Sequence, residues 1–227
     1  MVTGRDGADD AIDAQKRYYD LRAPDYLTIA PSDRRASGTL EAATARALVD
    51  ELRPEGDVLE IACGPGVFTR ELARHARSVT AVDASSEMLA RSRAEVAHEH
   101  VHYVEADIFE WRPDRSYDLV FFAFWLSHVP PSRFDEFWRL VRLCVGDHGR
   151  VAFVDEDDRG TGNDELRVLD GVPLARRTLA DGRQFDVIKL YWDPDELAAS
   201  LDALDWAVNI RRVGDTFMVG VGSPRHV

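Results

Sequence analysis

One segment of the sequence constrains the fold more than any other, a short apolar run that leads directly into a glycine-rich turn. Residues 58–62 form the apolar run, residues 63–66 form the turn, and a helical pattern follows over 67–76. A short apolar run of this kind is typical of a strand buried on both faces of a parallel sheet. Gly64 and Gly66 let the backbone turn tightly and approach a ligand without a Cβ clash. The segment therefore predicts a strand, a ligand-binding turn and a helix in succession.

The same alternation continues along the chain and predicts the fold class. Further strands are expected at 79–82, 101–104, 119–123 and 151–154, with helices at 86–96 and 134–145. The C-terminal part adds a strand at 185–191, a helix at 194–201 and a closing hairpin of 206–211 and 217–221. Strands that alternate with helices favour a parallel sheet covered by helices on both faces. We therefore expect an α/β, Rossmann-like fold with a mostly parallel seven-stranded sheet.

The domain organisation follows from length and from two segments that break the alternation. A chain of 227 residues fits one domain with a small accessory element. We expect a disordered N-terminus over 1–14 and a single domain over 15–227, with an N-terminal helical lid at 15–35 that Pro24 breaks into two pieces. The polar and charged segment 155–183 is expected to be an insert near the substrate pocket. These two segments are the ones placed to close a reactive site off from water.

Composition disfavours several classes of partner. The net charge of −13 and the lack of a basic stripe argue against nucleic acid. No apolar stretch is long enough to cross a bilayer, and the N-terminus has neither a basic start nor an apolar signal core, so we expect a cytoplasmic protein with no membrane partner. Cys63 and Cys144 match no metal spacing, and no compact set of metal ligands is visible, so no metal is predicted.

Acidic side chains follow two other predicted strands. Asp83 ends the second strand, and Asp107 follows the third strand with Ile108 beside it. A carboxylate at the first position can accept both ribose hydroxyls of an adenosine. Asp107 could accept the adenine amino group while Ile108 covers the ring; the alternatives are a helix cap for Asp83 and a turn residue for Asp107. Since the carboxyl ends of parallel strands share one edge, the two carboxylates and the glycine turn together predict an adenosine-containing ligand.

In this order, these motifs resemble the class I S-adenosylmethionine-dependent methyltransferases, over roughly residues 15–155 and the closing hairpin. The resemblance implies S-adenosyl-L-methionine as the cofactor, which leaves as S-adenosyl-L-homocysteine. It implies that the methionine end lies at the glycine turn, the ribose at Asp83 and the adenine at Asp107, under a lid tyrosine, Tyr19. The cofactor-binding residues implied in this way are Tyr19, Arg22, Glu60, Ala62, Gly64, Gly66, Asp83, Ala84, Met88, Asp107, Ile108 and Phe124.

Two later segments, 121–130 and 176–189, resemble the dehydrophos-type phosphonate O-methyltransferases. This closer resemblance implies an anion pocket beneath the N-terminal lid. It implies that His128, Arg177 and Lys189 are the catalytic residues. The substrate-binding residues would be the same three together with Tyr26 and Trp125.

The residue types themselves agree in part with an anion pocket. Four cationic residues occur close together in an otherwise acidic chain: Arg176, Arg177, Arg183 and Lys189. Arginine binds carboxylate or phosphate groups through two parallel hydrogen bonds, and lysine adds a point charge. The alternative is ordinary salt bridging on the surface with the acidic run 155–158. Since neighbouring residues point to different sides of an element, we expect only one of Arg176 and Arg177 to face the pocket.

The expected function is transfer of a methyl group to an oxygen of a small anionic metabolite, a phosphonate or a carboxylate, in natural-product biosynthesis. Such an oxygen needs positioning rather than a base. The main alternative is a neutral hydroxyl or amine acceptor with His128 as general base. A dehydrogenase is disfavoured because Thr69 replaces the third glycine of a dinucleotide fingerprint. A non-catalytic nucleotide-binding module is disfavoured by the intact glycine turn, and the oligomeric state is left open.

Overall fold

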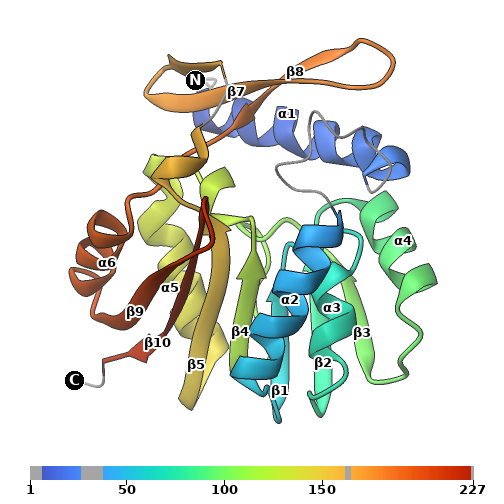
Figure 1. Ribbon diagram of the computed structural model, residues 1–227, viewed down its shortest axis with the longest axis vertical. Coiled ribbons are helices and arrows are strands. Elements are labelled where there is room, and N and C mark those ends of the chain that lie inside the picture. The colour runs from blue at the N-terminus through green and yellow to red at the C-terminus, as the bar shows by residue number, and fades with distance from the viewer. Residues whose placement is uncertain (1–6, 27–37, 162–164, 226–227) are drawn as a thin grey trace, which may run out of the picture.

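The computed structural model describes residues 7–26, 38–161 and 165–225, and a central sheet organises them (Figure 1). Its strands are β1 (Asp57–Ile61), β2 (Ser78–Asp83), β3 (Val101–Glu105), β4 (Tyr117–Ala123), β5 (Val145–Glu156), β9 (Trp206–Val213) and β10 (Phe217–Pro224). Their order is β3-β2-β1-β4-β5-β10-β9. The strands from β3 to β5 pair in parallel, and β10 runs antiparallel to both neighbours. The predicted seven-stranded, mostly parallel sheet is confirmed.

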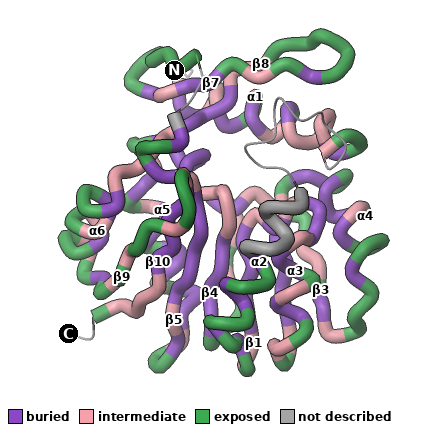
Figure 2. The backbone as a smooth tube through the Cα atoms, viewed as in Figure 1, coloured by how far each residue is buried: buried purple, intermediate pink, exposed green. Residues whose placement is uncertain are grey.

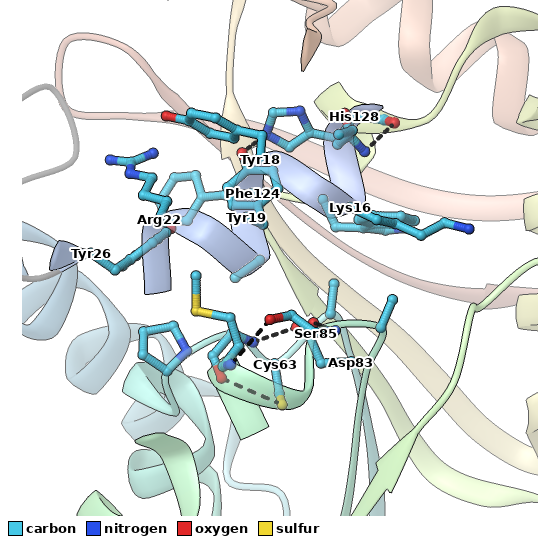
Figure 3. A pocket seen from close by; sticks show the side chains of 18 of the residues that line it. Lys16, Tyr18, Tyr19, Arg22, Tyr26, Cys63, Asp83, Ser85, Phe124 and His128 are labelled. Atoms are coloured by element: carbon cyan, nitrogen blue, oxygen red, sulfur yellow. Dashed lines mark hydrogen bonds between the residues drawn. The ribbon is translucent and has the colours of Figure 1, made fainter. Parts of the chain in front are cut away.

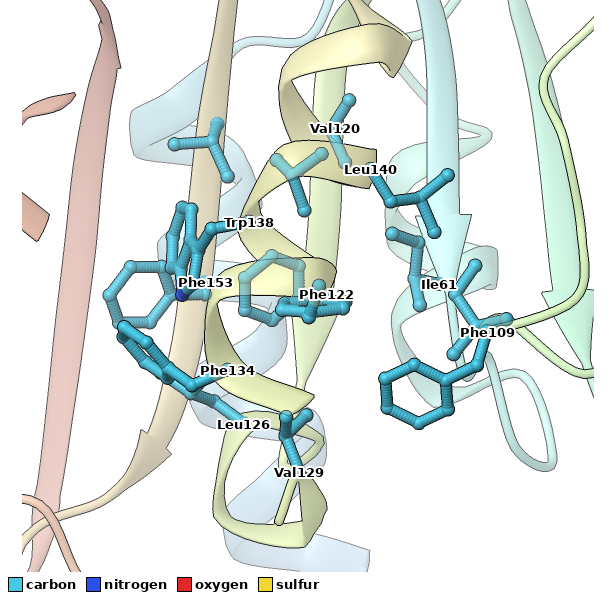
Figure 4. Close-up of a cluster of buried hydrophobic side chains, with 14 of the residues drawn as sticks. Ile61, Phe109, Val120, Phe122, Leu126, Val129, Phe134, Trp138, Leu140 and Phe153 are labelled. Atoms are coloured by element: carbon cyan, nitrogen blue, oxygen red, sulfur yellow. The ribbon is translucent and has the colours of Figure 1, made fainter. Parts of the chain in front are cut away.

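Helices cover both faces of this sheet, because successive strand residues point to opposite sides. Phe121 packs in a core cluster with α2 (Gly38–Leu52), α3 (Val67–Leu72) and α4 (Ser86–Glu95). Phe122, its neighbour, packs instead with α5 (Phe134–Cys144) and α6 (Pro194–Asp202). On that side Phe122 stacks on Phe153 at 5.4 Å between ring centroids, beside Trp138 (Figure 4). The strands between these helices are the most continuously buried part of the backbone (Figure 2).

The N-terminal helix α1 (Gly7–Arg22) corrects one expectation. Residues 7–14 are helical, not disordered, and the helix begins at Gly7. Its buried residues recur with the spacing of one helical face: Ala8, Ile12, Gln15 and Tyr18. Asp9 and Asp10 in the first turn complement the helix dipole, and Asp9 binds Arg133 at 2.7 Å. The helix therefore forms because its apolar face, which begins before the predicted boundary, has a surface to bury against.

The predicted break at Pro24 is present. A 3₁₀ turn, η1 (Ala23–Asp25), contains Pro24 and follows α1 directly. Proline has no N–H, so Pro24 cannot donate the helical hydrogen bond to the carbonyl of Asp20, which accounts for the end of the α-helix at this point. Residues 27–35 of the predicted lid lie outside the described residues. The other 3₁₀ turns are η3 (Leu126–His128), η4 (Pro131–Arg133) and η5 (Asp158–Thr161), and none of the helices in the described ranges has the length and apolar content needed to cross a membrane.

The segment expected as a polar insert contains a second sheet. Its strands are β6 (Leu166–Leu169), β7 (Val172–Thr178) and β8 (Gln184–Ile188), all antiparallel. Asp170 and Gly171 both have positive φ at the β6–β7 turn, as the two-residue turns that close hairpins require. The strand predicted at 185–191 is therefore β8, and it ends at Ile188. This small sheet lies over α1, so that α1 is held between it and the main sheet (Figure 1).

Candidate active site

A cavity of about 580 Å³ lies between α1 and the carboxyl ends of the parallel strands (Figure 3). One wall comes from α1 and from Tyr26 just beyond η1, and Tyr19 and Arg22 are part of it. The facing wall comes from the loops that follow β1 and β2, with Cys63 and Asp83. This volume lies within the range of sites that enclose a small molecule or cofactor.

The structure brings nearly all of the predicted site residues into this one cavity. Those that line it are Tyr19, Arg22, Tyr26, Glu60, Ala62, Gly64, Asp83, Ala84, Met88, Asp107, Ile108, Phe124, Trp125, His128, Arg177 and Lys189. Gly66 does not line it. Gly66 caps α3 with φ +86°, and a Cβ there would come within 2.3 Å of Ser92 Oγ. Close packing of the turn against α4, rather than contact with a ligand, explains a glycine at this position.

Glu60 gives the glycine turn a polar atom without a partner. Its side chain is buried, and its Oε2 has no hydrogen-bond partner among the described residues. Burial raises the pKa of this carboxyl to about 8. A cationic group bound in the cavity would supply a partner and favour the ionised carboxylate. Glu60 is thus suited to an ammonium group, such as that of the methionine end of the cofactor.

Asp83 is held rigidly where β2 ends. One carboxylate oxygen accepts the Gly64 N–H at 2.8 Å, and the other accepts the Ser85 N–H at 2.9 Å. Each oxygen keeps a lone pair that could accept a hydroxyl of a ribose. Burial raises the pKa of Asp83. The expectation that Asp83 faces the ligand cavity at the end of its strand is therefore met.

Two contacts that the sequence did not reveal connect α1 to the loops that follow the parallel strands. Ser85 Oγ donates a hydrogen bond to Asp20 at 2.8 Å, while the same oxygen accepts the Met88 N–H at the start of α4. Lys16 forms an ion pair of 2.6 Å with Asp107. Lys16, Ser85 and the buried Gln15 all line the cavity. Each of the three has a partner 65 or more positions away: Ser85 binds Asp20, Lys16 pairs with Asp107, and Gln15 binds His128. Only the packing of α1 over the sheet edge brings these pairs together.

His128 lies on the other side of the cavity, at the end of η3. Its Nδ1 lies 2.6 Å from the backbone oxygen of Ile188, and its Nε2 lies 2.8 Å from the hydroxyl of Tyr19. Burial, reinforced by the charge of Lys189, lowers the pKa of His128 well below its usual value. His128 is therefore a neutral imidazole that is held at both nitrogens.

Lys189 is buried, and its charge is balanced within the site. Its ammonium group pairs with Glu156 and donates a hydrogen bond to Ser127 Oγ at 3.1 Å. Asp155, completely buried, accepts the Ser127 N–H at 2.9 Å. Lys189 therefore pairs with a member of the acidic run 155–158, but inside the protein and not in the surface salt bridge that the alternative describes. Its expected role as an anion-binding cation stays a prediction.

The two arginines of β7 lie on opposite faces of the small sheet, as alternation along a strand requires. Arg177 lies opposite Phe185, which packs on Tyr18 of α1, whereas Arg176 is exposed and lies opposite Asp186. Both residues contribute to the lining of the cavity, and which guanidinium a ligand meets stays a prediction. Arg176 is paired with Asp186 at 3.4 Å, whereas Arg177 influences the pKa values of Tyr19 and His128. Arg183 pairs with Asp181 at 2.6 Å on the surface.

Two further polar atoms at the cavity have no hydrogen-bond partner among the described residues. They are Trp125 Nε1 and Arg22 Nε. The Arg22 guanidinium also lies 4.7 Å from the ring centroid of Tyr26 and 5.7 Å from that of Tyr18, so that it is held beside these two rings. Both atoms are donors, so this side of the cavity is suited to a ligand rich in acceptor oxygens.

Comparisons with known proteins agree with this geometry. A family model described as a methyltransferase domain matches residues 58–149. The solved structure of DhpI with SAH is 38% identical and covers 94% of this chain and 97% of DhpI, with a TM-score of 0.78. A DhpI complex with SAM and HEP is 37% identical, with coverage of 94% and 98% and a TM-score of 0.79.

A curated relative matches over a shorter stretch. Trans-aconitate 2-methyltransferase of Escherichia coli O7:K1 (strain IAI39 / ExPEC) is 35% identical over 97 residues, which is 42% of this chain and 37% of that protein. The chain thus matches a little over a third of the length of that relative, while it spans DhpI nearly from end to end. The sheet order, the cavity at its carboxyl edge and the likeness to DhpI agree. The chain belongs to the family of S-adenosylmethionine-dependent methyltransferases with a class I, Rossmann-like fold.

Proposed function

We propose that this methyltransferase transfers the methyl group of S-adenosylmethionine to an oxygen of a small anionic metabolite, a phosphonate or a carboxylate. The observation that carries the proposal is the set of donors on the α1 side of the cavity. Arg22 and Arg177 lie near the hydroxyl of Tyr19 and the imidazole of His128. Glu156, a carboxylate that lines the cavity, is already paired with Lys189. An acceptor with several negative oxygens matches this environment.

The cofactor would occupy the opposite side of the cavity. We assign its amino group to Glu60, its ribose to Asp83 and its adenine to Asp107 and Ile108, with Ala62, Gly64, Ala84 and Met88 completing the wall. The lone Oε2 of Glu60 and the two fixed oxygens of Asp83 fit these groups chemically. The cofactor supplies an electrophilic methyl group on a sulfonium. Tyr19 and Phe124 would close the cavity over it.

The protein's own contribution is mainly orientation. Arg22 and Arg177 would hold the oxygens that do not react, and leave one oxygen free to attack in line with the bond that breaks. Its lone pair forms the new O–C bond while the electrons of the C–S bond remain on sulfur. Because the acceptor oxygen is already anionic, His128 need not remove a proton. Trp125 and Tyr26 would form the walls around the acceptor.

The named relatives support an anionic acceptor. DhpI is known in a complex with HEP as well as SAM, and the curated relative is a methyltransferase of trans-aconitate. Together with the resemblance to the dehydrophos-type phosphonate O-methyltransferases, they support a role in the biosynthesis of a natural product. Within the proposed class, the likeness over nearly the whole chain favours a phosphonate.

A second candidate is a neutral hydroxyl or amine acceptor. The observation that favours it is the neutral His128, whose Nε2 is bonded to the hydroxyl of Tyr19. A proton could pass from the acceptor to Tyr19 while the Tyr19 proton passes to His128. His128→Asn separates the two: near-complete loss of turnover with substrate binding intact would favour the base, and a mild loss would favour positioning.

The proposal is tested by a panel of matched acceptors. The full chain is incubated with S-adenosylmethionine and, in turn, ethylphosphonate, propionate, propanol and propylamine. Mass spectrometry then follows each methylated product together with S-adenosylhomocysteine. Methylation of either anion in preference to the alcohol and amine is expected. Methylation of the neutral acceptors alone would overturn the proposal.

A further inference from the structure

A short chain of hydrogen bonds at the cavity has a fixed direction. The Ile188 carbonyl can only accept, so His128 Nδ1 must donate across their 2.6 Å contact. A neutral imidazole has one N–H, so Nε2 is an acceptor. The hydroxyl of Tyr19, 2.8 Å away, therefore donates its hydrogen to His128. No other arrangement of hydrogens satisfies both contacts while the imidazole is neutral.

The surroundings keep His128 neutral. The charged groups nearest to it are Arg22 from α1, Arg177 from β7, and Lys189 after β8, and all three oppose protonation. Glu156 and Asp155 at the end of β5 face Lys189 and Ser127 rather than the imidazole. Around Tyr19 the groups are Tyr18, Tyr26, Arg22 and Arg177, and burial raises the pKa of Tyr19 well above its usual value. Both members of the pair are thus uncharged at neutral pH.

The consequence concerns the oxygen of Tyr19. Its hydrogen is committed to His128, so this oxygen can only accept a hydrogen bond from a ligand. Arg22 and Arg177, close to the same hydroxyl, supply positive charge and donors. The site therefore offers two cationic side chains for an anionic oxygen. Beside them, the Tyr19 oxygen is a hydrogen-bond acceptor that requires a donor from the ligand. An anion that carries a hydroxyl group satisfies both requirements.

We propose that Tyr19, fixed by His128, makes the enzyme select an acceptor that bears a hydroxyl donor next to its anionic oxygen, as the singly ionised form of a phosphonate does. This inference rests on the proposed function and narrows it. A sulfonate has the same shape and charge but no hydroxyl, and a fully ionised phosphonate has lost its hydroxyl. Each would place a negative oxygen against the lone pairs of Tyr19. A simple carboxylate lacks the donor as well.

The proton balance of the reaction agrees with this selection. The hydroxyl proton stays on its phosphonate oxygen while a second, anionic oxygen takes the methyl group from sulfur. The product, a strongly acidic monoester, gives this proton to water and becomes an anion without a hydroxyl. It then lacks the group that Tyr19 requires, which favours release and limits the reaction to one methyl group.

The test compares two isosteric anions, ethylphosphonate and ethanesulfonate, on the full chain saturated with S-adenosylhomocysteine. Calorimetry measures both affinities at about pH 6 and about pH 9, for the unaltered protein, for Tyr19→Phe and for Tyr18→Phe as a control. Tyr18→Phe removes a hydroxyl from the same helix and leaves the bond to His128. Retained binding of S-adenosylhomocysteine shows that each variant is folded.

At the lower pH we expect ethylphosphonate to bind the unaltered protein at least about tenfold more tightly than ethanesulfonate. A buried hydrogen-bond acceptor that meets no donor lowers the affinity by about tenfold. The preference should shrink at the higher pH, disappear in Tyr19→Phe and persist in Tyr18→Phe. Equal affinities at the lower pH, or a preference that survives in Tyr19→Phe, would overturn this inference. The proposed function would still stand if the acceptor panel gave a methylated phosphonate. If neither anion bound and no anion were methylated, both would be overturned.

Discussion

Lys16 and Asp107 form an ion pair of 2.6 Å that joins the N-terminal helix to the loop after β3. Asp107 also accepts the Phe109 N–H at 2.9 Å, so its carboxylate is fixed from two directions. About two of its four acceptor positions remain for a ligand. The residue proposed to bind adenine is therefore also one of the residues that join α1 to the rest of the cavity.

This dual role predicts unequal effects of two substitutions. Asp107→Ala removes the proposed adenine contact and the ion pair, so it should weaken binding of S-adenosylhomocysteine by about tenfold or more. Lys16→Ala removes only a half-exposed ion pair, typically worth less than about 1 kcal/mol, so the loss should stay below about fivefold. Isothermal titration calorimetry measures both. An equally large loss in Lys16→Ala would contradict the assignment of Asp107.

The two glycines of the turn should respond differently to alanine. At Gly66 a Cβ would meet Ser92 Oγ at 2.3 Å and φ is +86°, so Gly66→Ala should lower the free energy of unfolding by about 2–4 kcal/mol. At Gly64 φ is +53° and nothing lies within 4 Å of a Cβ, so Gly64→Ala should cost about 1–2 kcal/mol.

Cofactor affinity should show the opposite order for these two variants. A methyl group at Gly64 enters the cavity, so S-adenosylhomocysteine should bind less tightly to Gly64→Ala than to folded Gly66→Ala. Urea unfolding and calorimetry on the same samples give both quantities. Equal losses of stability in the two variants would show that the contact with Ser92 does not prevent a side chain at position 66.

Glu60 predicts a pH-dependent stability of the ligand-free protein. Its pKa of about 8 in the folded state lies above its ordinary value, so the folded state keeps a proton that the unfolded chain releases. The stability from this group is complete at acid pH and is lost as pH rises from about 4.5 through about 8. Glu60→Gln should remove that loss.

The difference in melting temperature between Glu60→Gln and the unaltered protein, followed from about pH 5 to pH 9, tests this directly. The variant should gain stability relative to the unaltered protein up to about pH 8, and the difference should level off above that pH. Binding of S-adenosylhomocysteine should nevertheless weaken, because an amide binds an ammonium group less well than a carboxylate does. A difference that does not vary with pH would mean that Glu60 is ionised throughout.

The buried pair of Lys189 and Glu156 predicts strong coupling. Lys189→Met leaves the Glu156 carboxylate without its cation. Glu156→Gln leaves Lys189 beside Ser127, Asp155 and the ring of Tyr191. Loss of one partner of a buried pair costs about 3–5 kcal/mol. The double variant should be less destabilised than the sum of the two by at least about 1 kcal/mol, measured by urea unfolding. Additive losses would show that the pair contributes no mutual stabilisation.

The sheet and the ligand edge were predictable from the sequence because they depend on local pattern. Apolar runs such as 58–62 identify buried strands by themselves, and the glycine turn and Asp83 mark their carboxyl ends. Where strands are parallel, such ends must meet at one edge. The cofactor side of the cavity therefore followed from short segments and one topological rule.

The substrate side could be predicted only in part, because it depends on contacts between distant segments. The position of Lys189 in the chain does not reveal that Glu156 neutralises it, nor does that of Tyr19 reveal its bond to His128, 109 positions away. One missed signal was local: Asp170-Gly171 is a two-residue hairpin sequence within the supposed insert. The early start of α1 was missed because Ala8 and Ile12 form an apolar face only when Tyr18 is counted with them.

The central claim is that an anionic oxygen receives the methyl group, and one measurement addresses it most directly. The full chain is given ethylphosphonate and S-adenosylmethionine labelled with ¹³C in the methyl group, and the product is observed by ¹³C and ³¹P nuclear magnetic resonance. The account predicts a single labelled methoxy carbon coupled to phosphorus, formed in equal amount with S-adenosylhomocysteine. Cofactor turnover on a neutral acceptor, with no labelled methyl ester formed from either ethylphosphonate or propionate, would contradict it.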